Sequence, residues 1–225
     1  MQDKVYQEIQ AVFGETDRAV TAEDLPKLTY LEAVIKESLR LYPPVPIVTR
    51  EVHGDTPLPS GITLVDDTTV MFNIWGTHRN PAYWGPDAEE FRPERFLQGP
   101  LPHPAMFVPF SHSVRNCLVY NPAYWGPDAE EFRPKRFLQG PLPHPAMFVP
   151  FSHSVRNCLG ATYAMMSAKT ALANVIRRHR LLPPAGVRAA DLQRPLPVKY
   201  DIMMKAVDNF TLRIEERNQN KTLNV

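Results

Sequence analysis

One cysteine lies in a short loop directly before a stretch that favours a helix. The loop runs Phe151-Ser-His-Ser-Val-Arg156-Asn-Cys158-Leu-Gly160, and helix-forming residues follow from 161 to 178. A cysteine just ahead of a helix N-terminus lies at the positive end of the helix dipole, which favours its thiolate form. The thiolate is the form that ligates iron, and Gly160 lets the backbone come close to a flat group. The loop therefore predicts a cysteine thiolate suited to bind a metal ion, with a glycine that leaves room for a flat group beside it.

The same loop occurs twice in this chain. The segments 80–118 (copy one) and 121–159 (copy two) have the same sequence and differ only at Glu94 against Lys135. A solenoid is the alternative that such a repeat suggests, but two units are too few for a stacked core. We interpret the repeat as a recent tandem duplication or a gene-model error, so one copy is surplus.

Only one of the two cysteines can serve a single iron. Cys158 is followed by Gly160 and a predicted helix, whereas Cys117 is followed by Tyr120 and then Asn121-Pro122. Cys117 thus has no helix dipole behind it. The sequence favours Cys158 as the ligand and Cys117 as a decoy copy.

A pair of opposite charges lies on the most regular predicted helix. Glu37 and Arg40 are three residues apart, which places both charges on one face. By itself this pattern is typical of a solvated surface pair. Arg95 follows later in the chain, within Phe91-Arg-Pro-Glu-Arg-Phe96, and Arg136 is its counterpart in copy two.

Several elements must position these residues. Apolar periodicity predicts helices over 2–13, 28–41 and 160–179, and a short capped helix near Thr21 and Asp24. A strand is expected over 46–53, a hairpin from 62–65 and 69–73, and two tail strands, 198–204 and 210–215, around a turn at Asp208-Asn209. Residues 80–117 lack periodicity and are rich in Pro and Gly, which predicts a long ordered meander of the functional kind.

Composition restricts the function classes. The chain has 225 residues with a formal net charge of +1, so we expect one domain or a small pair and no nucleic-acid partner. Its two cysteines provide no disulfide framework and fit a reducing compartment. The seven histidines match no zinc-ligand spacing, and we interpret them as polar loop residues. No Gly-rich phosphate loop or protease signature is present.

The order of these motifs resembles the cytochrome P-450 family of haem-thiolate monooxygenases. The Glu-x-x-Arg helix, the Pro-x-Arg-Phe meander and the cysteine loop follow one another in that family's order, and segments 2–14 and 32–44 look most similar to the animal family-4 clan. The resemblance implies a mainly α fold with small β-sheets. It also implies that residues 1–225 form a partial domain, the C-terminal part of the family's fold, with meander and cysteine loop duplicated.

The resemblance also implies roles for particular residues. Haem is the expected cofactor, with Cys158 as its axial iron ligand. Ser154 stands where the family's loop pattern has its first glycine, which puts the loop geometry in question. No catalytic residue is assigned. The other cofactor-binding residues are expected to be Phe151, Arg156, Gly160 and Arg50, the two arginines as partners of the haem propionates. A buried network of Glu37, Arg40 and either Arg95 or Arg136 is expected to hold the meander on the helix.

The activity implied is oxygen insertion into a lipophilic, fatty-acid-like substrate, with electrons from an NADPH-dependent flavoprotein reductase. A full-length parent is expected on the cytosolic face of the endoplasmic reticulum membrane. The sequence has neither an apolar stretch of spanning length nor a signal peptide. This chain, without an anchor, is expected to be cytosolic or unstable. The alternative is a non-catalytic fragment or pseudogene-like product without the distal oxygen-activating helix, and we do not expect the chain alone to hydroxylate a fatty acid.

The sequence also favours one arrangement of the copies. Copy two has the intact junction from loop to helix, so we expect it to occupy the site, with Arg136 rather than Arg95 beside Glu37. Copy one is then expected to be displaced, which would expose its phenylalanines to solvent and promote aggregation. These phenylalanines are Phe91, Phe96, Phe107 and Phe110.

Overall fold

A computed structural model describes residues 1–58, 61–99, 101, 106–110, 158–187, 197–201, 203–207 and 211–217. The chain forms two compact units. The first unit comprises Met1–Pro44, Glu90–Gly99 and Gly160–Val225, and the second comprises Val45–Glu89 and Pro100–Leu159. Helices and small antiparallel sheets make up both, in agreement with the predicted mainly α fold with small β-sheets.

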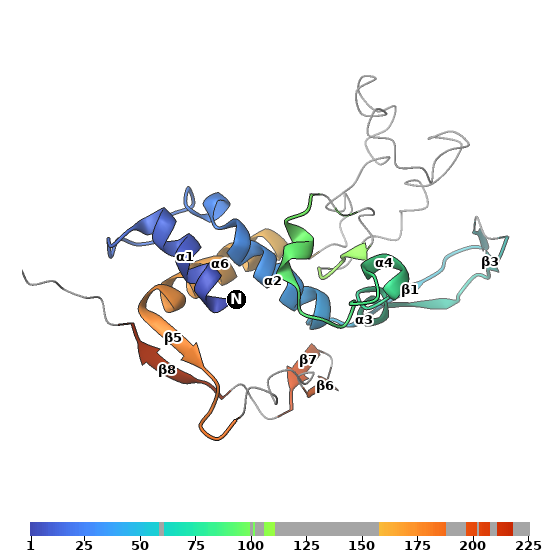
Figure 1. Cartoon of the computed structure of the whole chain (residues 1–225). Helices are drawn as coiled ribbons and strands as arrows, with labels where there is room; N and C mark the ends of the chain where they lie inside the picture. The colour runs from blue at the N-terminus through green and yellow to red at the C-terminus, as the bar shows by residue number, and fades with distance from the viewer. Residues whose placement is uncertain are drawn as a thin grey trace, which may run out of the picture. The chain divides into compact units, whose positions relative to one another are not determined.

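Three helices build the core of the first unit. They are α1 (Gln2–Phe13), α2 (Thr29–Leu41) and α6 (Ala161–Arg178), with the short 3-10 helix η1 (Leu25–Lys27) between the first two. Figure 1 shows α1, α2 and α6 lying side by side. All three were predicted within a residue or so at each end, because each carries an apolar stripe at helical spacing. The buried side chains are Val5, Ile9, Phe13, Leu25, Leu28, Leu31, Ile35, Ala173 and Ile176.

Polar side chains join these helices at defined points. Glu8 on α1 accepts hydrogen bonds from the backbone N–H groups of Tyr30 at 2.7 Å and Leu31 at 2.9 Å, and so caps the start of α2. Lys169 on α6 is buried and donates to the carbonyl of Leu25 and to Glu32, both at 2.6 Å. α6 is thereby tied to both η1 and α2.

The strands of the first unit pair differently from the prediction. β6 (Val198–Asp201) pairs with β7 (Met203–Ala206), and β5 (His179–Leu182) pairs with β8 (Arg213–Glu216), all antiparallel. The predicted strand 198–204 is therefore two strands that turn back on each other, and the tail does not pair around Asp208-Asn209. Because α6 ends at Arg178, the next residues extend and supply β8 with a partner that no local pattern reveals.

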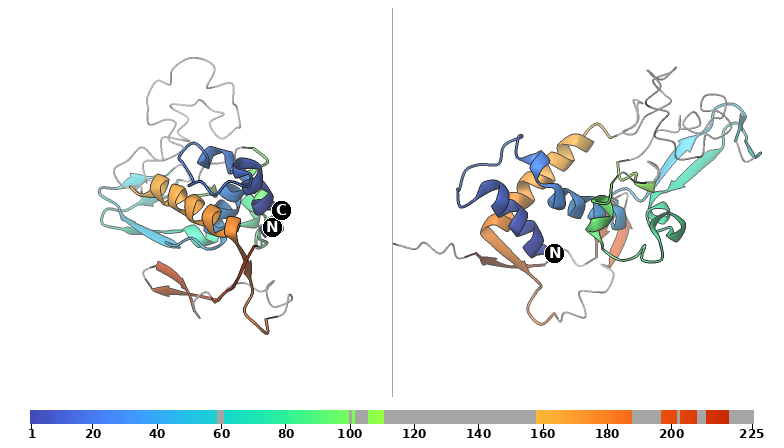
Figure 2. Two further views of the ribbon diagram at one scale, coloured as in Figure 1. Left: turned by 90° about the vertical axis from the view of Figure 1, so that its left-hand side faces the viewer. Right: turned by 45° about the horizontal axis from the view of Figure 1, so that its top comes forward.

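The second unit contains two nested strand pairs. β1 (Ile47–Glu51) pairs with β4 (Thr69–Asn73), and the short strands β2 (Thr56–Pro57) and β3 (Thr63–Leu64) pair between them. Figure 2 shows the β1–β4 pair as an extended two-stranded ribbon in light blue and cyan. The predicted hairpin of 62–65 with 69–73 does not form, because each of those strands pairs with an earlier one.

Two one-turn helices follow β4 in the second unit. They are α3 (Ile74–Thr77) and α4 (Pro81–Trp84). Asn73 caps the first by accepting from the N–H of Gly76 at 2.9 Å, and Asn80 caps the second by accepting from the N–H of Ala82 at 3.0 Å. Within the described ranges, no helix has both the length and the apolar character needed to cross a bilayer.

Candidate functional site

The Glu37–Arg40 pair is fully buried on α2. Both side chains have 0% exposure, and Arg40 holds the two carboxylate oxygens of Glu37 with its Nε at 2.7 Å and its Nη2 at 2.8 Å. This is the bidentate geometry that makes an arginine–carboxylate pair strong. The spacing by itself is typical of a solvated surface pair, but the structure shows that the pair is buried.

The same pair holds an irregular segment of copy one against α2. The backbone N–H of Arg92 donates to Oε1 of Glu37 at 2.7 Å, and Arg40 Nη2 donates to the carbonyl of Glu90 at 3.0 Å. Arg95, on the 3-10 helix η2 (Pro93–Phe96), is 8% exposed, and its Nε lies 3.6 Å from the same Glu37 oxygen. The structure thus brings Glu37, Arg40 and Arg95 together, and two of these links use the backbone.

Copy one therefore occupies the position for which the sequence favours copy two. Arg95 of copy one lies beside Glu37, whose carboxylate accepts hydrogen bonds from the Arg40 side chain and the Arg92 backbone and pairs with Arg95 at 3.6 Å. Arg136 itself lies outside the described residues. The described part of copy one is not displaced into solvent: Phe91 is 37% exposed, and the other three phenylalanines are half-buried, namely Phe96, Phe107 and Phe110.

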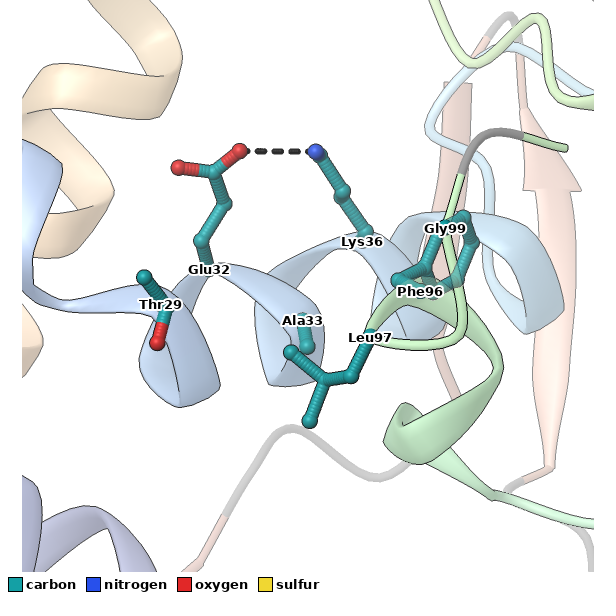
Figure 3. A pocket seen from close by; sticks show the side chains of 7 residues that line it. All are labelled: Thr29, Glu32, Ala33, Lys36, Phe96, Leu97 and Gly99. Atoms are coloured by element: carbon teal, nitrogen blue, oxygen red, sulfur yellow. Dashed lines mark ion pairs between the residues drawn. The ribbon is translucent and has the colours of Figure 1, made fainter.

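A shallow hollow lies beside this contact in the first unit. It has a volume of about 310 Å³ and lies between α2 and the last residue of η2 with the residues that follow it (Figure 3). Glu32 in its wall pairs with Lys36 at 2.7 Å and with Lys169 at 2.6 Å. Burial raises the pKa of Glu32, but the hydrogen bonds from the two lysines outweigh it and the pKa is lowered overall. The hollow is lined by Thr29, Glu32, Ala33, Lys36, Phe96, Leu97 and Gly99.

Glu32 is thus held as a carboxylate by two cations and is unsuited to act as a general acid. The hollow offers a charged and partly apolar surface.

Cys158 lies in the second unit, two residues before the N-cap of α6. Its side chain is exposed and forms no disulfide. Its backbone N–H donates to the carbonyl of Phe110 at 3.3 Å, and the helix begins at once, with the N–H of Ala164 donating to the carbonyl of Gly160 at 2.7 Å. An exposed thiol next to a helix start is accessible for metal ligation, and a cysteine thiolate is one of the side chains that can ligate a haem iron.

Of the other residues that are predicted to bind the cofactor, the structure describes Gly160 and Arg50. Arg50 lies on β1 in the same unit as Cys158, where it is half-buried and donates to the carbonyl of Thr49 at 2.7 Å. Phe151, Arg156 and Cys117 lie outside the described residues. Among the residues that are described, no cluster of three or more His, Cys, Asp or Glu side chains could hold a metal ion.

His78 is a structural residue that the sequence did not single out. It has 0% exposure, its Nε2 accepts the backbone N–H of Val108 at 2.9 Å, and its ring stacks on Phe107 with centroids 5.5 Å apart. From the sequence His78 is expected to be a polar loop residue, because the seven histidines match no zinc-ligand spacing, and its burial shows that this expectation was wrong for His78. It secures copy one within the second unit.

Comparison with known proteins identifies related chains. The family model described as Cytochrome P450 matches residues 1–119 and again residues 118–207, so that each match contains one copy. "Probable cytochrome P450 313a1" of Drosophila melanogaster is 31% identical over 96% of this chain and 35% of its own length. "Cytochrome P450 4V2" of Homo sapiens is 46% identical over 52% of this chain and 22% of its own.

A third relative gives the same picture. "Cytochrome P450 4A12B" of Mus musculus is 41% identical over 52% of this chain and 23% of its own length. This chain therefore spans about a third or less of the length of these curated relatives.

Proposed function

This chain belongs to the cytochrome P450 family, and from that premise we propose that it supplies the thiolate side of a haem monooxygenase acting on a lipophilic, fatty-acid-like substrate. The single observation that supports this most is the docking of Glu90–Gly99 on the buried Glu37–Arg40 pair. Using a buried, fully bonded ion pair to hold an irregular segment is costly for a protein whose only need is stability. It is expected where a loop must be held rigidly for a cofactor.

Cys158 would supply the thiolate ligand to the haem iron, and Phe151, Arg156, Gly160 and Arg50 would be further cofactor-binding residues. When bound, the haem iron supplies the oxygen chemistry, and a thiolate ligand donates electron density to it. The chain's own residues would bind and orient the haem. Arg50 and Arg156 would bind the propionates, since arginine can bind a carboxylate through two parallel hydrogen bonds.

The partner and the location follow the same family assignment. We propose that electrons come from an NADPH-dependent flavoprotein reductase. For a full-length parent we propose the cytosolic face of the endoplasmic reticulum membrane.

The experiment compares the two cysteines of the intact chain. Cys158→Ala should abolish the thiolate signature in the reduced carbon-monoxide difference spectrum of haem-loaded protein. Cys117→Ala is the matched control, with the same substitution in the same local sequence, and should leave the signature in place. The opposite result would show that copy one supplies the ligand and would overturn the assignment of Cys158.

A further inference from the structure

We propose that Glu94 selects which copy docks on α2, so that the chain uses the docked meander of copy one together with the cysteine of copy two. Glu94 acts here as a positioning residue for the docked segment Glu90–Gly99. Only the haem role of Cys158 rests on the proposed function; the choice of copy does not.

Glu94 makes two contacts with the helices of the first unit. Lys4 on α1 donates to Oε1 of Glu94 at 2.9 Å, and the hydroxyl of Tyr30 on α2 donates to the same oxygen at 3.2 Å. The Lys4 ammonium also lies 5.5 Å from the centroid of the Tyr30 ring. The hydrogen bond with Glu94 raises the pKa of Lys4, and the same bond lowers the pKa of Glu94, so both groups are charged at neutral pH.

Every other docking contact is available to both copies. The residues of copy two that correspond to Glu90, Arg92 and Arg95 are identical to them, so the buried network cannot discriminate between the copies. At the one position that differs, copy two carries Lys135, which would meet Lys4 with a like charge. An exposed ion pair contributes little by itself, but it decides the ratio between two otherwise equal competitors.

The connecting chain does not favour either copy strongly. Docking copy two would lengthen the connection from α2 by one repeat and shorten the connection to α6 by the same length of chain. Because the cost of closing a loop grows only slowly with its length, the two changes largely offset each other. Docking of copy two would replace the attraction between Glu94 and Lys4 by a repulsion between Lys135 and Lys4. This difference favours the docking of copy one over copy two by about tenfold.

A second contact in the other unit supports the joint use of both copies. In either copy alone, a Phe lies seven residues before its Cys, as Phe110 does before Cys117 and Phe151 before Cys158. In the structure the carbonyl of Phe110 accepts from the backbone N–H of Cys158, a hydrogen bond that joins the two copies. His78 contributes to this arrangement, since it holds Phe107 and Val108 of copy one.

Hydrogen exchange on the full chain tests the proposal, and it requires no haem. Peptic peptides that contain residue 94 or residue 135 differ in mass, so the two copies can be followed separately by mass spectrometry. In the native chain we expect the Glu94 peptide to exchange about tenfold more slowly than the Lys135 peptide. Equal exchange of the two peptides, or slower exchange of the Lys135 peptide, would overturn the docking of copy one.

Two variants test whether Glu94 determines which copy docks on α2. Lys4→Glu should transfer the protection to the Lys135 peptide, because the new carboxylate attracts Lys135 and repels Glu94. The double substitution Glu94→Lys with Lys135→Glu should transfer the protection to copy two, because copy two then carries the glutamate. Lys199→Glu, the same charge reversal on β6, is the matched control and should leave the pattern unchanged.

If protection stays with copy one in both variants, chain position and not Glu94 selects the copy, and the proposal is wrong. A failure of the carbon-monoxide test would leave these exchange results unaffected, so the two proposals fail separately.

Discussion

Glu37 is the residue on which the docked segment depends most. Its carboxylate accepts from Arg40 on its own helix and from the backbone of Arg92, and Arg95 lies against it. Removing one partner from a buried ion pair leaves the other charges without compensation. The geometry therefore makes Glu37 both the anchor of the segment and a weak point for stability.

We expect Glu37→Gln to destabilise the chain by about 3–5 kcal/mol, because the buried Arg40 and Arg95 would lose the carboxylate charge that faces them. The measurement is the free energy of unfolding in urea. Glu15→Gln, at an exposed position after α1, is the matched control and should change it by less than about 0.5 kcal/mol. A loss no larger than the control's would show that the pair contributes little.

At the scale of elements, side chains outside the apolar stripes set how the helices meet. Glu8 caps α2 from α1, and Lys169 joins α6 to η1 and α2. The connection between α1 and α2 depends on Asp24, whose side chain is 3% exposed and binds Arg18 through two bonds of 2.6 and 2.9 Å. Asp24 also accepts from the backbone and hydroxyl of Thr21.

These contacts predict a pH dependence for the α1–α2 connection. The hydrogen bond from Arg18, then those from Thr21, hold the pKa of Asp24 well below its ordinary 3.8. A lowered native pKa means that the stabilisation is fully present above the unfolded-state value and is lost as the pH falls below it. We expect Asp24→Asn to lower the unfolding free energy at pH 7 and to have a smaller effect near pH 3.

Thermal unfolding of Asp24→Asn and the native chain across this pH range checks the prediction. Asp3→Asn, at an exposed position on α1, is the matched control and should track the native chain. An Asp24→Asn effect that is constant with pH would contradict the role given to this carboxylate.

At the scale of the whole molecule, the chain carries two copies of a segment of which a single docking site holds one. Deletion of residues 111–151 joins Phe110 to Ser152, and deletion of residues 80–120 joins Arg79 to Asn121. Each removes the same length of chain, one repeat, and the two products differ only in keeping Glu94 or Lys135. They are therefore a matched pair that isolates the contact with Lys4.

We expect both deletions to raise the soluble yield and sharpen thermal unfolding, and the product that keeps Glu94 to melt about 2–4 °C higher at low salt. The difference should shrink as salt is added, because the Lys4–Glu94 pair is exposed and screened. A product with Lys135 that melts at the same temperature or higher would contradict the selection by Glu94.

Much of the local structure and some of the site could be predicted from the sequence alone. The apolar spacing in α1, α2 and α6 predicts those helices, the i, i+3 spacing of Glu37 and Arg40 places them on one face, and the family order of motifs marks Arg95 or its counterpart Arg136 as the third member of their network. Burial of His78 and the pairing of β5 with β8 could not be predicted. Such partners lie far apart in the chain, and hydrophobic periodicity reports only which side of an element is apolar.

The sequence by itself determined the family, the helices and the existence of two competing copies. Only the tertiary structure decided which copy docks on α2. The physical reason is that copies identical at all but one position share the same local preferences, so no local pattern distinguishes them. The difference between Glu94 and Lys135 has a consequence only where a distant side chain, Lys4 on α1, is brought against it by the packing of α1, α2 and η2.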